Sequence, residues 1–290
     1  MERTDKNIVK KAIKKRPDDA NKGTMGTLLS ICGSYGMAGA AMLSASAALR
    51  MGIGLHKCAV PKSIYPIIAQ SIWESVYLPL SETTDGKISA ENVELLLSEA
   101  NKSNAVLIGC GLSVCEDTKT IVNSFIENCE VPMLLDADAL NCIADNTEIL
   151  QRAKAPIIIT PHPGEMARLV NSTAKEVNAS REKVAVSFAK QHNVTVGLKG
   201  SGTVIASPDG RALINKTGNS GMATGGSGDV LAGMAAALLA QGAKPLDAAA
   251  AAVYLHGSAG DIAAEQLGKI SMLPSDIITQ IPDALKACGV

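Results

Sequence analysis

The sequence predicts an α/β protein whose mainly parallel sheet is covered by helices on both faces. Short aliphatic runs alternate with helical patterns along nearly the whole chain, and no linker, low-complexity segment or repeat of fixed period interrupts them. This alternation is typical of βαβ units. One run, Ile157, Ile158 and Ile159, is apolar at consecutive positions, as expected for a strand buried on both faces. We expect one domain over residues 21–290, preceded by a basic N-terminal arm over residues 1–20.

The individual elements follow from the spacing of apolar residues. The strand candidates are residues 27–32, 54–60, 105–108, 133–135, 157–160 and 194–198. Helical spacing of i, i+3, i+4 and i+7 occurs between them, at Val93, Leu96, Leu97 and Ala100 and again at Val122, Phe125, Ile126 and Cys129. Strands and helices therefore follow one another in the order that a parallel sheet requires.

The pattern changes in the C-terminal third of the chain. Residues 203–207 and 211–214 flank a Pro-Asp-Gly turn, so they are expected to form a β-hairpin. A glycine-rich loop follows over residues 218–228 and leads into a helix over about residues 229–241. An alanine-rich helix comes next. Small residues on adjacent helices allow close packing in a chain that has few aromatic side chains.

The composition excludes several classes of protein. Of 290 residues, 27 are Lys or Arg and 28 are Asp or Glu, and the aromatic residues are one Trp, four Tyr and two Phe, so neither charge nor stacking surface favours nucleic-acid binding. Residues 23–49 are uncharged, but they lack the roughly 20 apolar residues of a membrane span. Seven Cys without a CxxC pair fit reduced thiols inside a cell. We expect a cytoplasmic protein without nucleic-acid or membrane partners.

The chemistry is expected in the loops that follow the strands, because ligands bind beyond the carboxyl ends of parallel strands. Loops over residues 32–36, 109–112 and 161–165 are rich in glycine, although each alone is more often part of a turn than a ligand contact. No Walker A or GxGxxG motif occurs. The strongest segment is 219–229, where four glycines within eight residues precede a helix. Backbone N–H groups at such a helix N-terminus can bind phosphate.

Asp229 lies at the end of this segment, in or beside the first turn of the expected helix. It could merely complement the helix dipole, a contribution of about 0.3–1 kcal/mol. Alternatively, it could accept a proton from a substrate hydroxyl while the loop holds a phosphoryl group in transfer. We favour the second interpretation, because a site that only binds an anion would not place a carboxylate beside it.

Seven ordered segments between residues 22 and 285 resemble the NAD(P)H-hydrate dehydratases, repair enzymes of the ribokinase-like superfamily. They are Gly33-Ser34 with 36–41, 48–55, 136–141, 160–165, Leu198-Lys199-Gly200 with Thr203, 218–229, and 254–257 with 259–261. One loop departs from the family: its Gly-Pro-Gly-Leu-Gly appears here as Gly109-Cys110-Gly111-Leu112-Ser113. The resemblance implies a ribokinase-like, three-layer α/β/α fold, to which the residues add a C-terminal β-hairpin.

The resemblance also implies a reaction. The (S)-hydrated form of NADH or NADPH would be dehydrated after its C6 hydroxyl receives a phosphoryl group from ADP or ATP, and inorganic phosphate would then leave. Phosphoryl transfer depends mainly on positioning and charge stabilisation, which a glycine loop can supply. The choice of donor and the choice between NADH and NADPH stay open. A free-standing dehydratase domain, without the epimerase domain of many family members, favours ADP.

The resemblance further implies roles for residues of this chain. Asp229 would accept the C6 hydroxyl proton, and at a pKa near the reference of about 3.9 it would be ionised at pH 7. The anion hole would be formed by Gly226, Ser227 and Gly228. The adenine nucleotide would be contacted by Lys199, Gly200, Ser201, Gly202, Thr203 and Gly228. The hydrated-dinucleotide pocket would be lined by Ala40, Gly111, His162 and Asp229. A lone His such as His162 is more often structural.

Metal and assembly remain less specified. Mg²⁺ is expected because phosphate charges need neutralising, but the sequence shows no cluster of metal ligands. Asp136 and Asp138 could serve as ligands, or could end a strand and cap a helix, and we favour capping. The resemblance implies a homotetramer.

Two alternatives differ in class from this hypothesis. An ordinary hydroxymethyl kinase of the same superfamily would use the same anion hole and the same Asp229, but would yield a stable phosphorylated product. A nucleotide-binding sensor or scaffold would use the loop without catalysis. The segments 136–141 and 161–165 favour the dehydratase over the kinase.

Overall fold

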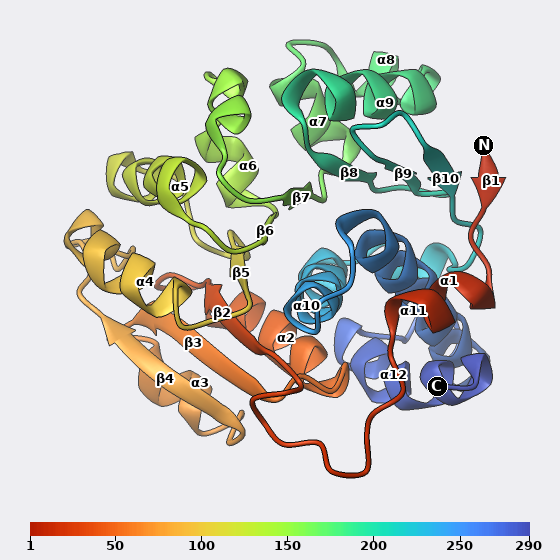
Figure 1. Cartoon of the computed structure of the whole chain (residues 1–290), viewed down its shortest axis with the longest axis horizontal. Helices are drawn as coiled ribbons and strands as arrows, with labels where there is room; N and C mark the ends of the chain where they lie inside the picture. The colour runs from red at the N-terminus through yellow and green to blue at the C-terminus, as the bar shows by residue number, and fades with distance from the viewer.

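A computed structural model describes the complete chain, residues 1–290, and confirms the α/β class (Figure 1). Ten strands form one sheet in the order β1-β10-β9-β8-β7-β6-β5-β2-β3-β4. The strands are β1 (Glu2–Arg3), β2 (Thr27–Ile31), β3 (Leu55–Pro61), β4 (Ser75–Leu80), β5 (Ala105–Ile108), β6 (Met133–Leu135), β7 (Ile157–Ile159), β8 (Thr195–Leu198), β9 (Val204–Ala206) and β10 (Ala212–Ile214). Only the β8–β9 and β9–β10 pairings are antiparallel, so the predicted parallel sheet and C-terminal hairpin are both present.

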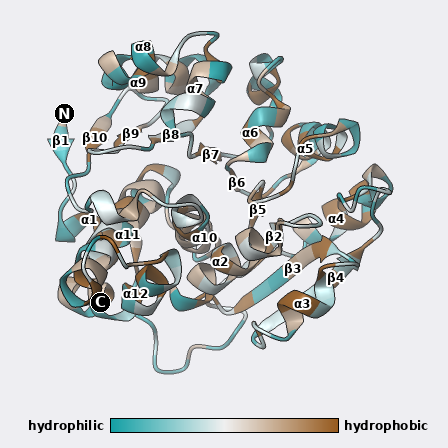
Figure 2. Ribbon diagram, turned by 180° about the vertical axis from the view of Figure 1, so that it is seen from behind, coloured by the Kyte–Doolittle hydropathy of each residue, from teal (hydrophilic) through white to brown (hydrophobic).

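Helices cover both faces of the sheet, which makes the three layers visible from opposite sides in Figures 1 and 2. They are α1 (Lys6–Ala12), α2 (Ala38–Arg50), α3 (Tyr65–Ala69), α4 (Val93–Ala100), α5 (Glu116–Asn128), α6 (Asp138–Cys142), α7 (Pro163–Leu169), α8 (Ala174–Ala179), α9 (Arg181–His192), α10 (Ser227–Ala240), α11 (Pro245–Leu267) and α12 (Pro274–Cys288). Short 3-10 helices span Ala90–Asn92, Thr147–Arg152 and Ser220–Met222.

Two hydrophobic cores lie on the two faces of the sheet. Leu107 belongs to a cluster of 48 buried residues that includes much of α2, α10 and α11. Its neighbours in β5, Val106 and Ile108, belong to a second cluster of 37 residues that includes parts of α4, α5 and α9. Successive side chains of a strand point to opposite faces, which is why β5, β6 and β7 are apolar at every position. None of the helices has both the length and the apolar character to cross a membrane.

Close helix packing replaces bulky side chains in the first of these cores. Gly233 on α10 faces α2 so closely that a Cβ atom there would lie 2.1 Å from the carbonyl oxygen of Ser44. Any larger residue at this position would push the two helices apart. The small residues that the sequence shows on these helices therefore decide their spacing, and with it the position of the N-terminus of α10.

All six predicted strands are present, with ends that differ by at most one residue, but β1 and β4 were not predicted. β4 contains Pro79, which argues against a central strand; as an edge strand it needs partners on one side only. β1 has two charged residues and pairs with β10 at the opposite edge. The predicted N-terminal arm thus contributes β1 and α1, and Lys11 of α1 forms a 2.8 Å ion pair with Asp247 of α11. The division into an arm and a single domain stays a prediction.

Candidate active site

The loops after the parallel strands meet at the carboxyl edge of the sheet. After β2, the backbone N–H of Gly33 donates to the carbonyl of Cys110 after β5, over 2.8 Å. After β8, the N–H of Lys199 donates to the carbonyl of Pro161 after β7, also over 2.8 Å. These links join the glycine-rich loops that the sequence singles out. The loops are thus joined in two pairs along one rim of the sheet.

A buried ion-pair cluster lies in the middle of this rim. The Lys199 ammonium is 2.7 Å from Asp136 Oδ1, which also accepts a 2.7 Å hydrogen bond from the Thr160 hydroxyl. Glu165 Oε2 lies 3.8 Å from the same ammonium. Burial acts to lower the pKa of Lys199, but the two carboxylates outweigh it and raise that pKa, so the lysine stays charged. Burial raises the pKa of Glu165.

Neither Asp136 nor Asp138 caps a helix, so the favoured interpretation of this pair was wrong. Asp136 directly follows strand β6, but its carboxylate binds Lys199 and Thr160. The N-cap of α6 is Ala137, at φ 50°, and no side chain caps this helix. Asp138 lies in the first turn and accepts a 2.8 Å hydrogen bond from the backbone N–H of Ser113. Both carboxylates therefore hold neighbouring strand-end loops in place.

The N-terminus of α10 points into this cluster. Gly226 is its N-cap at φ 96°, and a Cβ atom on Gly226 would lie 2.5 Å from Leu43 of α2. A Cβ atom on Gly228 would lie 3.4 Å from Lys199 Nζ and 4.0 Å from Asp136 Oδ2. The helix N-terminus and the lysine therefore face the same space, where N–H groups, the helix dipole and an ammonium can together bind a phosphoryl group.

Asp229 lies in the first turn of α10 and is partly buried. Its carboxylate, that of Asp136 and the sulfur of Cys110 have ligand atoms within 4.8 Å of one another. Burial, and then the charge of Asp136, raise the pKa of Asp229 to about 6. The expectation of a pKa near the reference value was therefore wrong, because it ignored both effects. At pH 7 the carboxylate is still mostly ionised, and it holds a proton more firmly than an exposed Asp would, as suits a proton acceptor.

Ala40 and Gly111 lie side by side. Gly111 has φ 63°, and a Cβ atom on it would lie 2.8 Å from the Cβ of Ala40 on α2. The Ser34 hydroxyl donates to the carbonyl of Gly111 over 2.9 Å and fixes this loop. Two residues predicted to line one pocket are thus neighbours, and the missing side chain of Gly111 lets its loop approach α2 closely.

His162 has a structural task. Its Nδ1 accepts hydrogen bonds from the N–H groups of Gly164 (2.9 Å) and Glu165 (3.2 Å), so it caps α7. This assigns the ring proton to Nε2, which lies 3.3 Å from Glu165 Oε1. The ring is half exposed and joins the ion-pair cluster through Glu165. With both nitrogens engaged, His162 can meet a ligand with its ring face or edge but has no free nitrogen for acid–base work.

The segment 199–203 connects β8 to β9 with two glycines at positive φ, Gly200 at 144° and Gly202 at 72°. The Thr203 hydroxyl donates to the carbonyl of Gly200 over 3.2 Å. Gly228 lies close to the Lys199 side chain at the start of this segment. The structure therefore brings together the residues predicted to contact an adenine nucleotide. The exposed Ser201 lies at the turn of the segment, with its carbonyl bound by Arg181.

Ser227 is the buried member of the predicted anion hole. Its hydroxyl lies 3.4 Å from Nε2 of His256 on α11. Burial lowers the pKa of His256 to about 4, so this histidine is neutral at physiological pH. The Ser227 side chain is therefore turned toward α11, and its backbone N–H donates to the carbonyl of Thr224 over 3.4 Å.

The protein's own donors do not form a magnesium site. Cys110, Asp136 and Asp229 are close enough together to share an ion, but Mg²⁺ prefers oxygen ligands and does not select a thiol. Asp136 also has its Oδ1 bound to Lys199. A magnesium ion at this site would need most of its ligands from phosphate and water.

Sequence reasoning missed three side chains of this site. Glu165 could have been found, because it ends the Thr-Pro-His-Pro-Gly-Glu segment already singled out. Cys110 was noticed only as a departure in a loop. Arg181 begins a helix far from any motif, and nothing in the sequence indicates that its guanidinium contacts the segment 199–203.

Comparison with known proteins gives a consistent result. The sequence profile of the NAD(P)H-hydrate dehydratases matches residues 28–283. The bifunctional NAD(P)H-hydrate repair enzyme of Moorella thermoacetica is 42% identical over 272 residues, which are 94% of this chain and 51% of that protein. The ADP-dependent (S)-NAD(P)H-hydrate dehydratase of Neisseria meningitidis serogroup B is 37% identical over 258 residues, 88% of this chain and 83% of that protein. The chain thus spans about half the length of the bifunctional relatives it matches.

Solved structures agree with these relatives. The ADP/ATP-dependent NAD(P)H-hydrate dehydratase from Bacillus subtilis, co-crystallised with ATP/Mg²⁺, superposes with a TM-score of 0.83 at 30% identity and covers 98% of this chain and 97% of its own. A ribokinase-like superfamily protein from Enterococcus faecalis gives a TM-score of 0.83 at 26% identity, over 99% of this chain and 96% of its own. The predicted ribokinase-like fold is confirmed.

Proposed function

The chain belongs to the NAD(P)H-hydrate dehydratase family, and on this basis we propose that it restores NADH or NADPH from the (S)-hydrate with ADP or ATP as phosphoryl donor. One observation carries the proposal: the N-terminus of α10 brings Asp229 and the glycine N–H groups to the space that Lys199 faces. The Neisseria relative is named as ADP-dependent and the Bacillus structure as ADP/ATP-dependent, which supports either donor.

The proposed first step is phosphoryl transfer. The C6 hydroxyl oxygen of the hydrate attacks the terminal phosphorus of the nucleotide, and Asp229 takes the hydroxyl proton. The bond from that phosphorus to its bridging oxygen breaks, and the electron pair leaves with the shortened nucleotide. The backbone N–H groups of Gly226, Ser227 and Gly228 stabilise the charge on the transferred group, which is the main protein contribution in this kind of reaction.

The proposed second step is elimination. The lone pair of the ring nitrogen expels inorganic phosphate from C6, and loss of a proton from C5 restores the ring double bond. Phosphate is a far better leaving group than hydroxide, so the nucleotide's phosphoryl group makes the dehydration possible. The products are NADH or NADPH, inorganic phosphate and the shortened nucleotide.

The two ligands are proposed to enter from different sides of Asp229. The adenine nucleotide contacts Lys199, Gly200, Ser201, Gly202, Thr203 and Gly228, and the hydrated dinucleotide lies against Ala40, Gly111 and His162. Support comes from the contacts between Gly111 and Ala40 on one side, and between Gly228 and Lys199 on the other. The proposed role of His162 is positional, because its Nδ1 caps α7 and its Nε2 contacts Glu165.

Magnesium, assembly and location complete the proposal. Mg²⁺ would enter with the nucleotide phosphates, as the ATP/Mg²⁺ in the Bacillus structure suggests, and would neutralise their charge. The proposed assembly is a cytoplasmic homotetramer. Exposed apolar side chains such as Trp73 (83% exposed) and Ile270 offer contact surface for other subunits. Sedimentation analysis of the purified protein would measure the number of subunits.

The test is an assay with hydrated NADH and ADP, ATP or no nucleotide. We expect the absorbance of NADH to return together with free phosphate, and only when a nucleotide is present. A stable phosphorylated product without NADH would instead support the kinase alternative. Asp229→Ala should abolish turnover while the variant still binds nucleotide. Full turnover by this variant would refute the assigned proton acceptor.

A further inference from the structure

We propose that Arg181 is a positioning residue whose guanidinium holds the segment 199–203 in the conformation that receives the adenine nucleotide. This inference rests on the proposed function and deepens its nucleotide side. Arg181 is the first residue of α9, a helix that no sequence motif connects with the site.

The guanidinium makes two hydrogen bonds to backbone carbonyls around this segment. Nη1 donates to the carbonyl of Ser201 over 2.8 Å, and Nη2 donates to that of Leu198 over 3.0 Å. One contact lies at the end of β8 and the other lies inside the segment, so a single planar group spans the point where the chain leaves the sheet. A planar fork suits such a two-point contact, which a lysine ammonium cannot reproduce.

Gly200 lies directly against the same guanidinium. A Cβ atom at this position would be 2.9 Å from Nη2, 3.1 Å from Cζ and 3.2 Å from Nη1 of Arg181. Three guanidinium atoms at nearly equal distance mean that the plane of the group faces the Gly200 backbone. Gly200 also has φ 144°, a conformation that glycine adopts at little cost and other residues rarely adopt. The segment thus has an open conformation that the arginine restrains from one side.

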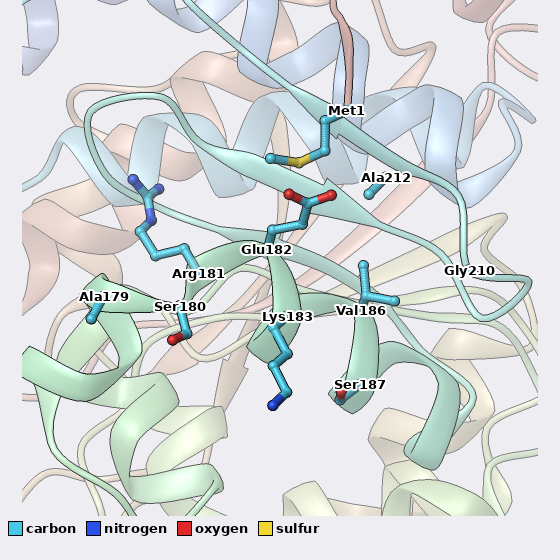
Figure 3. Close-up of a pocket in the computed structure, with 10 residues that line it drawn as sticks. All are labelled: Met1, Ala179, Ser180, Arg181, Glu182, Lys183, Val186, Ser187, Gly210 and Ala212. Carbon is cyan, nitrogen blue, oxygen red and sulfur yellow. The ribbon is translucent and has the colours of Figure 1, made fainter.

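The support of Arg181 is itself firm. Behind it, α9 packs into the second core through the buried residues Ala185, Phe188 and Ala189. Figure 3 shows the next two side chains turning elsewhere, with Glu182 extending toward Met1 and Lys183 to the opposite side. These residues line a hollow of about 790 Å³ between α9 and β10. Arg181 is therefore the side chain by which α9 reaches this segment.

The charge of Arg181 has no partner in the protein. No carboxylate lies within ion-pair distance of it, since it takes part in none of the ion pairs of the chain. Its Nε is buried without a hydrogen-bond acceptor, and burial lowers its pKa. Arg181 is partly buried, and its guanidinium is held in the protein by the carbonyl oxygens of Ser201 and Leu198. Beside a segment that receives a polyanion, this charge also raises the local affinity for phosphate.

The role predicts a specific kinetic signature. Without the guanidinium, the segment 199–203 loses its restraint, and the nucleotide must order it on binding. Asp229 and the Ala40–Gly111 contact lie on other elements and keep their positions. The KM for ADP should therefore rise while the KM for hydrated NADH stays constant. A merely structural residue would change both together with the melting temperature.

The experiment compares Arg181→Ala and Arg181→Lys with Arg152→Ala, a control that removes an exposed arginine paired with Glu127. We expect Arg181→Ala to raise the KM and the Kd for ADP about tenfold, which corresponds to about 1.4 kcal/mol. Free guanidinium ion should restore part of this loss in Arg181→Ala only. Arg181→Lys should retain part of the affinity, and Arg152→Ala should match the wild type.

Direct binding of ADP, measured by calorimetry, separates this inference from the proposed function. If the wild type binds ADP but does not turn over hydrated NADH, the function fails and the Kd ratio still tests Arg181. An unchanged Kd in a folded Arg181→Ala variant would overturn the inference, as would equal rises of both KM values. If Arg181→Ala does not fold, the Kd of Arg181→Lys decides: a value equal to that of the wild type refutes the two-point contact.

Discussion

Replacing the proposed proton acceptor by its neutral isostere, Asp229→Asn, should make the protein more stable. In the folded chain, burial and then Asp136 raise the pKa of Asp229 from the ordinary 3.8 to about 6. One pH unit of pKa difference corresponds to about 1.4 kcal/mol, so ionised Asp229 costs the fold about 3 kcal/mol. The variant removes this cost, because an amide of the same shape carries no charge.

The pH dependence of the gain follows from the sign of the shift. A folded state that holds the proton more tightly than the unfolded state loses stability as the pH rises from about 4 to about 6. Below that window Asp229 is neutral in both states, and the substitution gains nothing. Above it the wild type bears the full cost. The gain of Asp229→Asn should therefore be only about 0.5 kcal/mol at pH 4 and about 3 kcal/mol at pH 7.5.

Urea unfolding of both proteins at the two pH values measures this difference. The matched control is Asp209→Asn. Hydrogen bonds from Ser207 and Arg211 lower the pKa of Asp209 to about 2, so this substitution should not stabilise the protein at pH 7.5. An equal gain of Asp229→Asn at both pH values, or no gain at pH 7.5, would refute the reasoning that the carboxylate is held in an unfavourable environment.

Three further predictions concern the same region. The acid limb of the pH profile of kcat/KM should lie near pH 6 and move to higher pH in Cys110→Ala, because a hydrogen bond from the Cys110 thiol lowers the pKa of Asp229. Cys110→Ser should keep the limb in place, and an unmoved limb in Cys110→Ala would contradict this contact. Lys199→Met should cost about 3 kcal/mol of stability, because it leaves the buried carboxylate of Asp136 without its cation; a melting temperature within a degree of the wild type would argue against a stabilising pair. Gly233→Val should destabilise the fold by about 1–3 kcal/mol through overpacking between α10 and α2, and an unchanged urea midpoint would show that the two helices can separate freely.

The fold could be predicted largely because its signals are local. The three consecutive isoleucines at 157–159 already indicate a strand that is buried on both faces. The helix that begins near Asp229 shows its apolar face within four turns. β4 escaped prediction because Pro79 is compatible only with an edge, and edges are decided by the rest of the sheet. β1 has only two residues, so its pairing with β10 depends wholly on where the chain returns.

The site was predictable where a single loop carries it and unpredictable where distant residues meet. Asp229 and its glycines are adjacent in the sequence, so their function could be proposed from spacing alone. Lys199 and Asp136 are 63 positions apart, and only the order of the parallel strands brings them together. For His162 the family resemblance implied a ligand contact, whereas its residue type favoured a structural role; the structure shows that it caps α7.

The near-neutral net charge of the chain conceals a negative balance at the site itself. The site contains three carboxylates, those of Asp136, Glu165 and Asp229, and one ammonium, that of Lys199. Arg181 lies on the other side of the segment 199–203. Phosphates brought into this space would meet carboxylates as well as N–H groups, so part of their charge must be neutralised by something that arrives with them. By the same repulsion, phosphates bound nearby would raise the proton affinity of Asp229, which would favour the proposed transfer of the hydroxyl proton when the phosphoryl group is in place. Asp136 thus does more than anchor Lys199, since its charge also raises the pKa of Asp229, the proposed proton acceptor.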